Sequence, residues 1–581
     1  MKSLQGLWME MLADAGIWFD ICTIRDGKTA SDRLKTEGES FLTITLPTYG
    51  KDFERSLDQG YVAHDQFSSF KKTGGLPRFL GGFLELVFER SSGQLLDVPS
   101  IDAIRTIRQL TLGMGKINAR CSERRERAAL RQYIQCETEV EESILTWSEA
   151  DQLRFSRISL LCLDRLFDRV TKRIEQDELR GRHGPGATAD RLRGNAKYTG
   201  IQWTHRLEEV LPSSDFLIPN YRHFELLDRV NFCEPGAELP SKVVLVPKTP
   251  KTPRVIAEEP THMQFVQQSL QELIYDEVGR DDILSSLIGF RNQEPNQLLA
   301  EKGSRDGSLA TLDLSEASDR VAWEHVRVLM QHHPRLWELV DASRTQKALV
   351  TGHGEIRLSK FASMGSALTF PIEAMIFLVI VLMGVEKTLK RPLCRKDVKR
   401  LIGRVRVFGD DIICPSNAVD SVISGLEAHG YRVNASKSFW TGKFRESCGK
   451  EYYDGTDVTI VRARQSLPSR RKHVQEIVST VSMRNQFYLA GAWSTVRVLD
   501  DLLEQIIPFP AVCDESGSLG KSSFLPIVGE KMDNDLHIPM VRGVSVQVTI
   551  KESPLDGWPA LMKFFLSRAK EEIVDLFDWS E

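Results

Sequence analysis

Two adjacent acidic residues, Asp410 and Asp411, are of a type that metal-dependent phosphoryl chemistry can use. They follow Gly409 between two short apolar runs, Val405 to Phe408 and Ile412 to Cys414, and this pattern predicts a tight hairpin with the acids at its tip. Two neighbouring carboxylates at an apolar tip repel each other unless a cation is present. Asp and Gly are also ordinary turn residues, so the pair alone leaves both interpretations equal.

A third acid, Asp313, favours the metal interpretation, because it ends a short apolar strand predicted at Leu309 to Leu314. Nucleotide addition is an in-line displacement in which two divalent ions, about 3.5–4 Å apart, stabilise the attacking and leaving oxygens. Mg²⁺ prefers oxygen ligands and keeps several waters, so a few carboxylates on adjacent strands suffice. We therefore predict that Asp313, Asp410 and Asp411 bind two Mg²⁺ ions, with Mn²⁺ as the alternative ion.

A basic segment, Pro247 to Arg254, has a proline and a cation at every third position. In a polyproline-like extension with three residues per turn, Lys248, Lys251 and Arg254 would share one face. Such a face could hold a triphosphate and its pyrophosphate leaving group, with Glu258 orienting Arg254. A proline-rich linker with solvated charges is the alternative, and the nearby acids favour the phosphate role.

A loop of small residues, Ser363 to Ser366, precedes Thr369 and an apolar helix that Pro371 suits at its first turn. Gly365 permits unusual backbone angles and the close approach of a ligand. The hydroxyl groups could contact a sugar, and ordinary helix-entry chemistry is the equal alternative.

Lys437 lies in the segment Asn434 to Ser438, after a predicted helix at Ala418 to His429. A lysine here could protonate the leaving pyrophosphate. An exposed loop lysine without a catalytic role is the equal alternative.

The elements that position these residues change along the chain. The first 240 or so residues are predicted to be mainly helical, and the middle third is richer in strands. Tyr452-Tyr453 and Val458 to Val461 flank Asp454 to Asp457, which predicts a second hairpin. Helices return after about residue 466, at Val474 to Met483 and Thr495 to Ile507.

Three further segments bear on the organisation. The charged helix predicted at Ser122 to Gln135 favours a solvated face over an RNA-binding face. His183 to Gly186 is a loop dominated by turn residues. Ile372 to Val385 is the most apolar stretch, but it is shorter than the 20 or so residues that span a bilayer, so we predict a buried core helix and no membrane contact.

Length and composition set the class of protein. With 581 residues, 41% of them hydrophobic and 27% charged, a soluble protein of two to four lobes is expected. The net charge of −4 means that any nucleic-acid contact must use a locally positive channel. Nine scattered cysteines without a Cys-x-x-Cys pair favour a reducing cytosol over a disulfide framework or a zinc site, and the N-terminus does not resemble a signal peptide.

Five segments together resemble a known family. In chain order they read PKTPKTPRVIAEEP, TLDLSEASD, SMGSALTFPIEAMIF, VFGDDIICP and FRESCGKEYYDGTDVT. Taken together they look like the replicase catalytic subunit of single-stranded RNA bacteriophages of the levivirus type. The resemblance covers roughly residues 240 to 460, and the last segment, Phe444 to Thr459, is the most distinctive.

This resemblance implies an α+β right-hand polymerase with fingers, a palm built from an antiparallel sheet with helices, and a helical thumb. It implies primer-independent copying of single-stranded RNA from nucleoside triphosphates. The predicted division is an N-terminal region and fingers at 1–240, fingers with the basic segment at 241–307, palm at 308–443, and palm–thumb hairpin with thumb at 444–581.

The resemblance also assigns roles to residues. Asp313, Asp410 and Asp411 match the metal ligands, and Lys437 matches a candidate proton donor. The residues matching the nucleotide-binding positions are Lys248, Lys251, Arg254, Ser318, Asp319, Ser363, Gly365 and Thr369. The chain departs from the pattern at Phe408, where the family often has Tyr, and at Ser366 to Leu368, which leaves open which group contacts the ribose.

Family members can recruit host elongation factors Tu and Ts and a ribosomal small-subunit protein. These partners, and the cytoplasm of an infected bacterium as the location, are expectations from the resemblance alone.

Three other functions share some of these features. A reverse transcriptase shares the carboxylates, but usually has Ala rather than Gly before the two Asp residues. A non-catalytic RNA-binding or packaging protein needs the cations but not the three acids. A two-metal nuclease would cleave RNA without added nucleotides.

Overall fold

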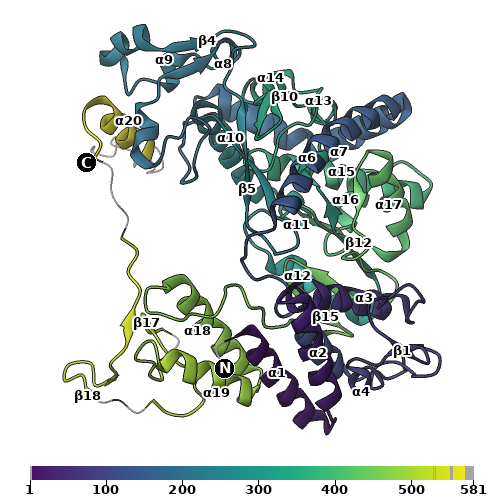
Figure 1. The fold of residues 1–581 in the computed structure, drawn as a ribbon. Coiled ribbons are helices and arrows are strands. Elements are labelled where there is room, and N and C mark those ends of the chain that lie inside the picture. The colour runs from purple at the N-terminus through teal and green to yellow at the C-terminus, as the bar shows by residue number, and fades with distance from the viewer. Residues whose placement is uncertain (1–2, 514, 528, 530, 550–553, 569–581) are drawn as a thin grey trace, which may run out of the picture.

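A computed structural model describes residues 3–513, 515–527, 529, 531–549 and 554–568, and it confirms the predicted α+β class (Figure 1). Long helices dominate before residue 240, as predicted. The main ones are α1 (Leu4–Phe19), α2 (Ile24–Glu37), α3 (Leu46–Gln59), α5 (Ile101–Leu112), α6 (Glu123–Thr146) and α7 (Glu149–Glu175).

The central sheet has three antiparallel strands in the order β11 (Arg406–Phe408), β12 (Asp411–Pro415) and β7 (Leu309–Leu312). Phe408 pairs with Asp411, so the turn of the predicted hairpin consists of Gly409 and Asp410. Gly409 has a φ of 59°, a left-handed conformation that glycine adopts without strain. The hairpin is confirmed, but Asp411 is the first residue of a strand rather than part of the tip.

Helix α15 (Thr369–Leu389) packs behind this sheet and against α17 (Val419–Ala428) and α7. By length and composition it could cross a membrane, and 94% of its apolar stretch is buried inside the protein. The helix is longer than the apolar run suggested, because its polar ends continue the same helix. The predicted buried core helix is confirmed.

A second sheet has the order β10 (Gly354–Arg357), β9 (Lys347–Val350), β5 (Ser241–Val246) and β6 (Arg254–Glu258). Val246 pairs with Arg254, so the basic segment is the loop of an antiparallel hairpin. The predicted polyproline-like extension is therefore wrong. The apolar residues on both sides of the segment pair as strands, and this pairing forces the chain between them to reverse.

The distinctive segment after residue 443 forms β14 (Phe444–Ser447), β15 (Lys450–Tyr453) and β16 (Thr456–Asp457). The predicted second hairpin is present, with Asp454 and Gly455 both at positive φ in its turn. The second strand is shorter than predicted, because Val458 to Val461 leave the ladder. Helix α12 (Glu294–Asp306) packs against β14 and β15.

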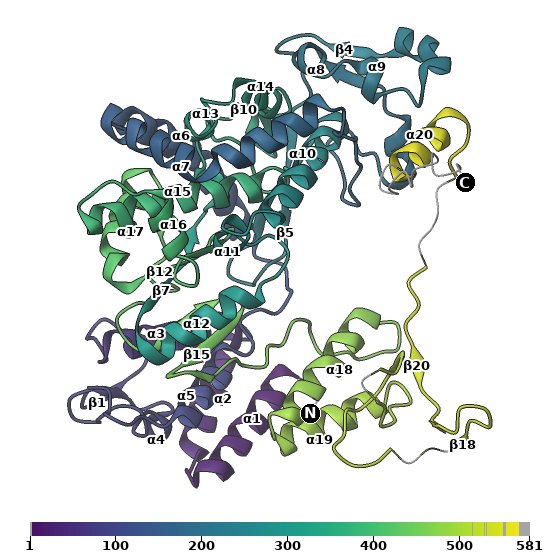
Figure 2. The same ribbon diagram turned by 180° about the vertical axis from the view of Figure 1, so that it is seen from behind.

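The predicted C-terminal helices are present as α18 (Val474–Leu489) and α19 (Trp493–Glu504). Helix α1 packs on α19, so segments far apart in the sequence lie side by side (Figures 1 and 2). The part of the chain between α19 and α20 (Gly557–Arg568) forms only short strand pairs where it is described, so this region is less helical than predicted.

Two large hydrophobic cores hold these elements. The first joins α7, α10 (Thr261–Gly279), α15, α17 and the central sheet. The second joins the N-terminal helices α1, α3 and α5 to β14, β15, α18 and α19. Leu312 and Ile412, which adjoin two of the candidate carboxylates, belong to the first core.

Candidate active site

A cavity of about 860 Å³ opens beside the central sheet. Its walls come from α6, the β5–β6 loop, the chain that follows β7, and the start of α15. All of the predicted site residues line it except Asp411 and Ser363. Those that do are Lys248, Lys251, Arg254, Asp313, Ser318, Asp319, Gly365, Thr369, Asp410 and Lys437.

Strand register brings the predicted metal ligands to one edge of the central sheet. Ile412 pairs with Leu312 in antiparallel register, so the neighbouring Asp411 and Asp313 lie at the same end of β12 and β7. Burial, with the neighbouring Asp410 charge, raises the pKa of Asp411 to about 7. Burial also raises the pKa of Asp313, although Lys437 offsets part of that shift. Three acids crowded in this way are the donor set that a divalent cation would stabilise.

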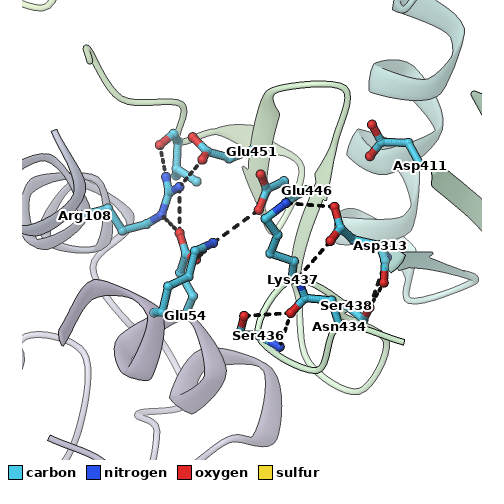
Figure 3. Close-up of polar contacts among 12 residues, drawn as sticks. Glu54, Arg108, Asp313, Asp411, Asn434, Ser436, Lys437, Ser438, Glu446 and Glu451 are labelled. Carbon is cyan, nitrogen blue, oxygen red and sulfur yellow. Dashed lines mark hydrogen bonds and ion pairs between the residues drawn. The ribbon is translucent and has the colours of Figure 1, made fainter. Parts of the chain in front are cut away.

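Asp313 already has two partners (Figure 3). Lys437 Nζ lies 2.9 Å from its Oδ1, and Asn434 Nδ2 donates to its Oδ2 at 3.0 Å. Burial lowers the pKa of Lys437, but the Asp313 carboxylate raises it more, so the net shift is upward. Lys437 is therefore not a free loop lysine. It neutralises one of the predicted metal ligands.

Asp411 faces a different neighbour. Its Oδ1 accepts from the backbone N of Cys448 at 3.3 Å and lies 3.4 Å from the Ser447 hydroxyl. Figure 3 shows it apart from the Asp313–Lys437 pair. Asp410, by contrast, is exposed in the turn and lines the cavity.

The oxygens of the three acids are not yet at mutual ligand spacing. Among the residues that the structure describes, the compact group with ligand atoms within 4.8 Å of one another is Asp164, Asp168 and His333, away from this cavity. Asp410 and Asp411 must therefore reorient their side chains toward Asp313 to share ions with it. A turn aspartate such as Asp410 can do so by side-chain rotation.

The predicted phosphate-binding cations line the same cavity although the predicted extension was wrong. Desolvation by the cavity walls lowers the pKa of Lys248, with Arg254 and Lys437 adding to the shift. Glu258 does not orient Arg254. The two lie at opposite ends of β6, about 13 Å apart at 3.3 Å per residue, and Glu258 instead lies 3.7 Å from Lys242, its cross-strand partner.

The other residues predicted to bind the nucleotide have partners within the protein. Ser318 Oγ donates to Glu373 at 2.6 Å, and Asp319 pairs with Lys360 at 2.8 Å. Thr369 Oγ1 donates to the backbone carbonyl of Ser363 at 2.9 Å. Ser363 itself is 1% exposed, and its hydroxyl bonds the Tyr133 hydroxyl at 2.6 Å. Ser363 therefore shapes the wall behind the cavity rather than facing into it.

Gly365 allows the loop to pass close to β6. Its φ is 139°, and a Cβ atom there would lie 1.9 Å from the carbonyl oxygen of Ala257. Ala257 N donates to the Met364 carbonyl at 2.8 Å, which fixes the two segments together. Only glycine fits, so the predicted close backbone approach is made with the protein itself.

One side of α6 is part of the site, which the sequence interpretation missed. Arg125, Gln132, Tyr133 and Cys136 line the cavity, so the predicted solvated face is wrong for this side of the helix. Their spacing of seven, one and three residues places them on one side of a helix. This spacing was the only sequence signal that these four residues could act together.

Lys360 anchors α6 to Asp319. Its ammonium is fully buried, 2.8 Å from both Glu137 and Asp319, and it lies 3.6 Å from the centre of the Tyr133 ring. A buried cation held by two carboxylates and an aromatic face is geometrically fixed. Lys360 therefore orients Asp319, and no sequence motif singled it out.

A buried charge network continues from the site toward the N-terminal helices (Figure 3). Glu446, on β14, lies 3.5 Å from Lys51. Burial raises the pKa of Glu446, but Lys51 and Lys437 lower it more, to about 2, so it is a carboxylate beside Lys437. Farther along, Arg108 bridges Glu54 and Glu451 at 2.9 and 2.8 Å. The network was not predicted.

Glu373 should make nucleotide binding depend on pH. Burial raises its pKa to about 8, with the Ser318 bond offsetting part of the shift, so the side chain is neutral at pH 7. As pH rises through 8, Glu373 gains a negative charge inside the cavity whose lysines and arginine are predicted to bind phosphate. We expect the KM for nucleotides to rise by roughly three- to tenfold between pH 7 and 9, and Glu373→Gln to remove that rise.

The measurement is KM against pH for the wild type and the variant. Glu386→Gln is the matched control, because Glu386 is on the same helix and 9% exposed but outside the cavity. The stability of the folded state should change with pH in the same direction as nucleotide binding. A raised carboxyl pKa favours the folded state below pH 4.5, and this contribution is lost as pH rises to about 8. Superimposable KM profiles for wild type and Glu373→Gln would contradict the assignment.

Comparison with known proteins places the site in context. Residues 237–484 match the family described as "RNA replicase, beta-chain". The RNA-directed RNA polymerase beta chain of Escherichia phage MS2 is 37% identical over 216 residues, which is 37% of this chain and 36% of that one. The corresponding chain of Enterobacteria phage fr is 36% identical over 216 residues, with the same two coverages.

The beta subunit of Qbeta virus (strain MX1) is 34% identical over 258 residues, 44% of this chain and 39% of its own. The matched segments thus span little more than a third of the length of these relatives. The structure titled "In situ structure of BmCPV RNA-dependent RNA polymerase at elongation state" has 10% identity and a TM-score of 0.37 over 60% of this chain and 33% of that one. The resemblance noted in the sequence is confirmed over its middle segment, which contains every predicted site residue.

Proposed function

We propose that this chain is an RNA-directed RNA polymerase that copies a single-stranded RNA phage genome without a primer. One observation carries the proposal. Strand register brings Asp313 and Asp411 to one edge of a sheet, and Asp313 and Asp410 line a cavity whose other wall holds Lys248, Lys251 and Arg254. The acids suit metal ions and the cations suit a triphosphate, so the two requirements of nucleotidyl transfer meet in one place.

The donor set fits two Mg²⁺ ions, and Mn²⁺ has the same oxygen preference. Asp313, Asp410 and Asp411 would hold them, and when bound the ions would stabilise charge on the attacking and leaving oxygens. The protein supplies positioning through the β11–β12 turn and the end of β7.

The remaining residues act on the nucleotide. The three cations of the β5–β6 loop hold the triphosphate. Asp319, fixed by Lys360 and lining the cavity, is the group we assign to the ribose hydroxyls in preference to Ser363, which is buried. Lys437 keeps its proton while it pairs with Asp313, and it can donate that proton to the pyrophosphate when this pair opens.

The assignment extends to organisation and setting. In it, residues 308–443 form the palm, and 1–240 and 241–307 supply the N-terminal region and fingers. Residues 444–581, of which 569–581 lie outside the described residues, are assigned to the palm–thumb hairpin and thumb. The template is single-stranded RNA in the cytoplasm of an infected bacterium. Host elongation factors Tu and Ts and a ribosomal small-subunit protein are the partners to be tested.

The deciding experiment is RNA-templated synthesis by the purified chain with Mg²⁺, offered ribo- or deoxyribonucleotides, with and without bacterial extract. We expect ribonucleotide incorporation, with extract dependence if host proteins are required. Equal use of deoxyribonucleotides would favour the reverse transcriptase. RNA cleavage without nucleotides would favour the nuclease, and RNA binding without synthesis in either condition would favour the packaging protein.

A further inference from the structure

A second cavity, of about 490 Å³, shares no lining residue with the candidate active site. It lies between η2 (Gly194–Thr199), β3 (Gln202–Thr204), the start of α10, and α20, which contributes Met562. Helix α20 packs on η2, beside the pair of β3 and β4 (Asn231–Cys233) and away from α18 and α19 (Figures 1 and 2). The glycine-rich loop that begins at His183 forms another wall.

Two polar side chains that line this cavity have buried atoms without a hydrogen-bond partner within the part of the chain that the structure describes. His262 is 5% exposed, and both of its ring nitrogens are buried without a hydrogen bond. Gln202 Oε1 is also buried and unbonded. Buried polar groups are almost always hydrogen-bonded, so two such groups, on different elements but in the lining of one cavity, point to a polar ligand.

The hydrogen-bond donors and acceptors of these groups indicate which chemical class of ligand would fit. Burial lowers the pKa of His262 to about 4, so its ring is neutral and offers one donor and one acceptor. The Gln202 amide offers a further acceptor and donor. Paired donors and acceptors of this kind match the edge of a nucleobase.

Three aromatic rings belong to the lining of this cavity. His183 lies 4.7 Å from Tyr198 and 4.6 Å from Phe265, measured between ring centroids, and all three rings line the cavity. Burial lowers the pKa of His183 to about 3, so this ring is neutral too. Base-on-aromatic stacking is the usual way in which proteins hold unstacked bases.

The loop that carries His183 is fixed in place. Lys197 is 2% exposed, and its ammonium donates to the carbonyls of Gly184 at 2.6 Å and Gly186 at 2.5 Å. This wall of the cavity is therefore held in place by the protein's own contacts. Arg229, exposed at its edge, and the exposed Arg191 and Arg193 on either side of the lining Leu192 place positive charge where a backbone phosphate would lie.

We propose that this cavity binds one unstacked base of single-stranded RNA, outside the catalytic cavity. The base stacks on the aromatic wall, its edge bonds His262 and Gln202, and the adjoining phosphate contacts Arg229. The choice of RNA over a free nucleotide rests on the proposed function, whereas the base recognition rests on the cavity alone.

The first test is cross-linking, which needs no synthesis and so is independent of polymerase activity. Single-stranded RNA containing 4-thiouridine is bound to the full-length chain without nucleotides and irradiated, and cross-linked peptides are identified by mass spectrometry. We expect cross-links within residues 183–202, and excess unlabelled single-stranded RNA should remove them. Cross-links confined to the catalytic cavity would overturn the proposal, and competition by nucleoside monophosphates but not by RNA would overturn the RNA assignment.

The second test is affinity. His262→Phe keeps the ring volume and removes both nitrogens, and Tyr198→Leu removes a half-buried stacking surface. Each should weaken binding of a 20-nucleotide single-stranded RNA by roughly tenfold without changing its salt dependence, whereas Arg229→Gln should lower the salt slope by about one. His429→Phe is the control, because His429 is 2% exposed and outside the cavity. Wild-type affinity in both ring variants would refute the site.

Discussion

Replacing Asp410 with Asn should abolish nucleotide incorporation while RNA binding survives. Asp410 lines the cavity from an exposed turn position that Asn also tolerates, so the fold should not change. Loss of one anionic ligand removes several kcal/mol of transition-state stabilisation, and each 1.36 kcal/mol is a factor of ten, so incorporation should fall by about a thousandfold or more. Incorporation and filter binding of RNA are measured on the same preparation.

Asp420→Asn is the matched control, since Asp420 is an exposed aspartate in the first turn of α17. Asp411→Asn should cost less than Asp410→Asn, because Asp411 faces Cys448 rather than the cavity. Metal titration of both variants should show the larger affinity loss for Asp410→Asn. Undiminished synthesis in Asp410→Asn would remove the polymerase assignment.

Arg108→Met should destabilise the protein by about 3–5 kcal/mol, the usual cost of removing one partner from a buried ion pair. Burial lowers the pKa of Arg108, but Glu451 and Glu54 raise it more, so the net shift is upward. The guanidinium is 0% exposed and also donates to the Val458 carbonyl. Methionine fills much of the volume but leaves two buried carboxylates without this cation. Urea unfolding measures the change.

Arg105→Met on the same helix is the control for that experiment. Arg105 is 42% exposed, its ion pair with Asp102 is 3.5 Å long, and it donates to the Asp457 carbonyl at 2.7 Å. Its loss should therefore cost about 1–2 kcal/mol. Equal shifts for the two variants would show that the buried network contributes no more than a surface pair.

Local patterns predicted the parts of the site that local structure determines. The apolar runs around Gly409 specified the hairpin, and a strand ending on Asp313 specified the third acid. The cations of the basic segment reach the cavity even though their backbone is a hairpin loop, because the loop is short and bounded by paired strands. The helices predicted at Val474 to Met483 and Thr495 to Ile507 are present as α18 and α19.

Contacts between distant segments were not predictable in this way. Lys360 meets Glu137 across more than two hundred residues, and neither residue stands out in the sequence. The wrong prediction that Glu258 orients Arg254 has the same origin. Cross-strand register pairs Glu258 with Lys242, whereas the prediction relied on proximity in sequence. Such partners are determined by tertiary packing, and local sequence patterns do not predict which distant residues will be in contact.

The bond between Arg108 and Glu451 also has a consequence for how the chain acquires its structure during synthesis. The second core joins helices near the N-terminus to residues beyond 439. At translation rates of about 5–20 residues per second, Glu451 leaves the ribosome roughly 20–70 s after Arg108. Over that interval α1, α3 and α5 lack the surface that completes their core. The N-terminal helices are made first, yet they finish folding among the last.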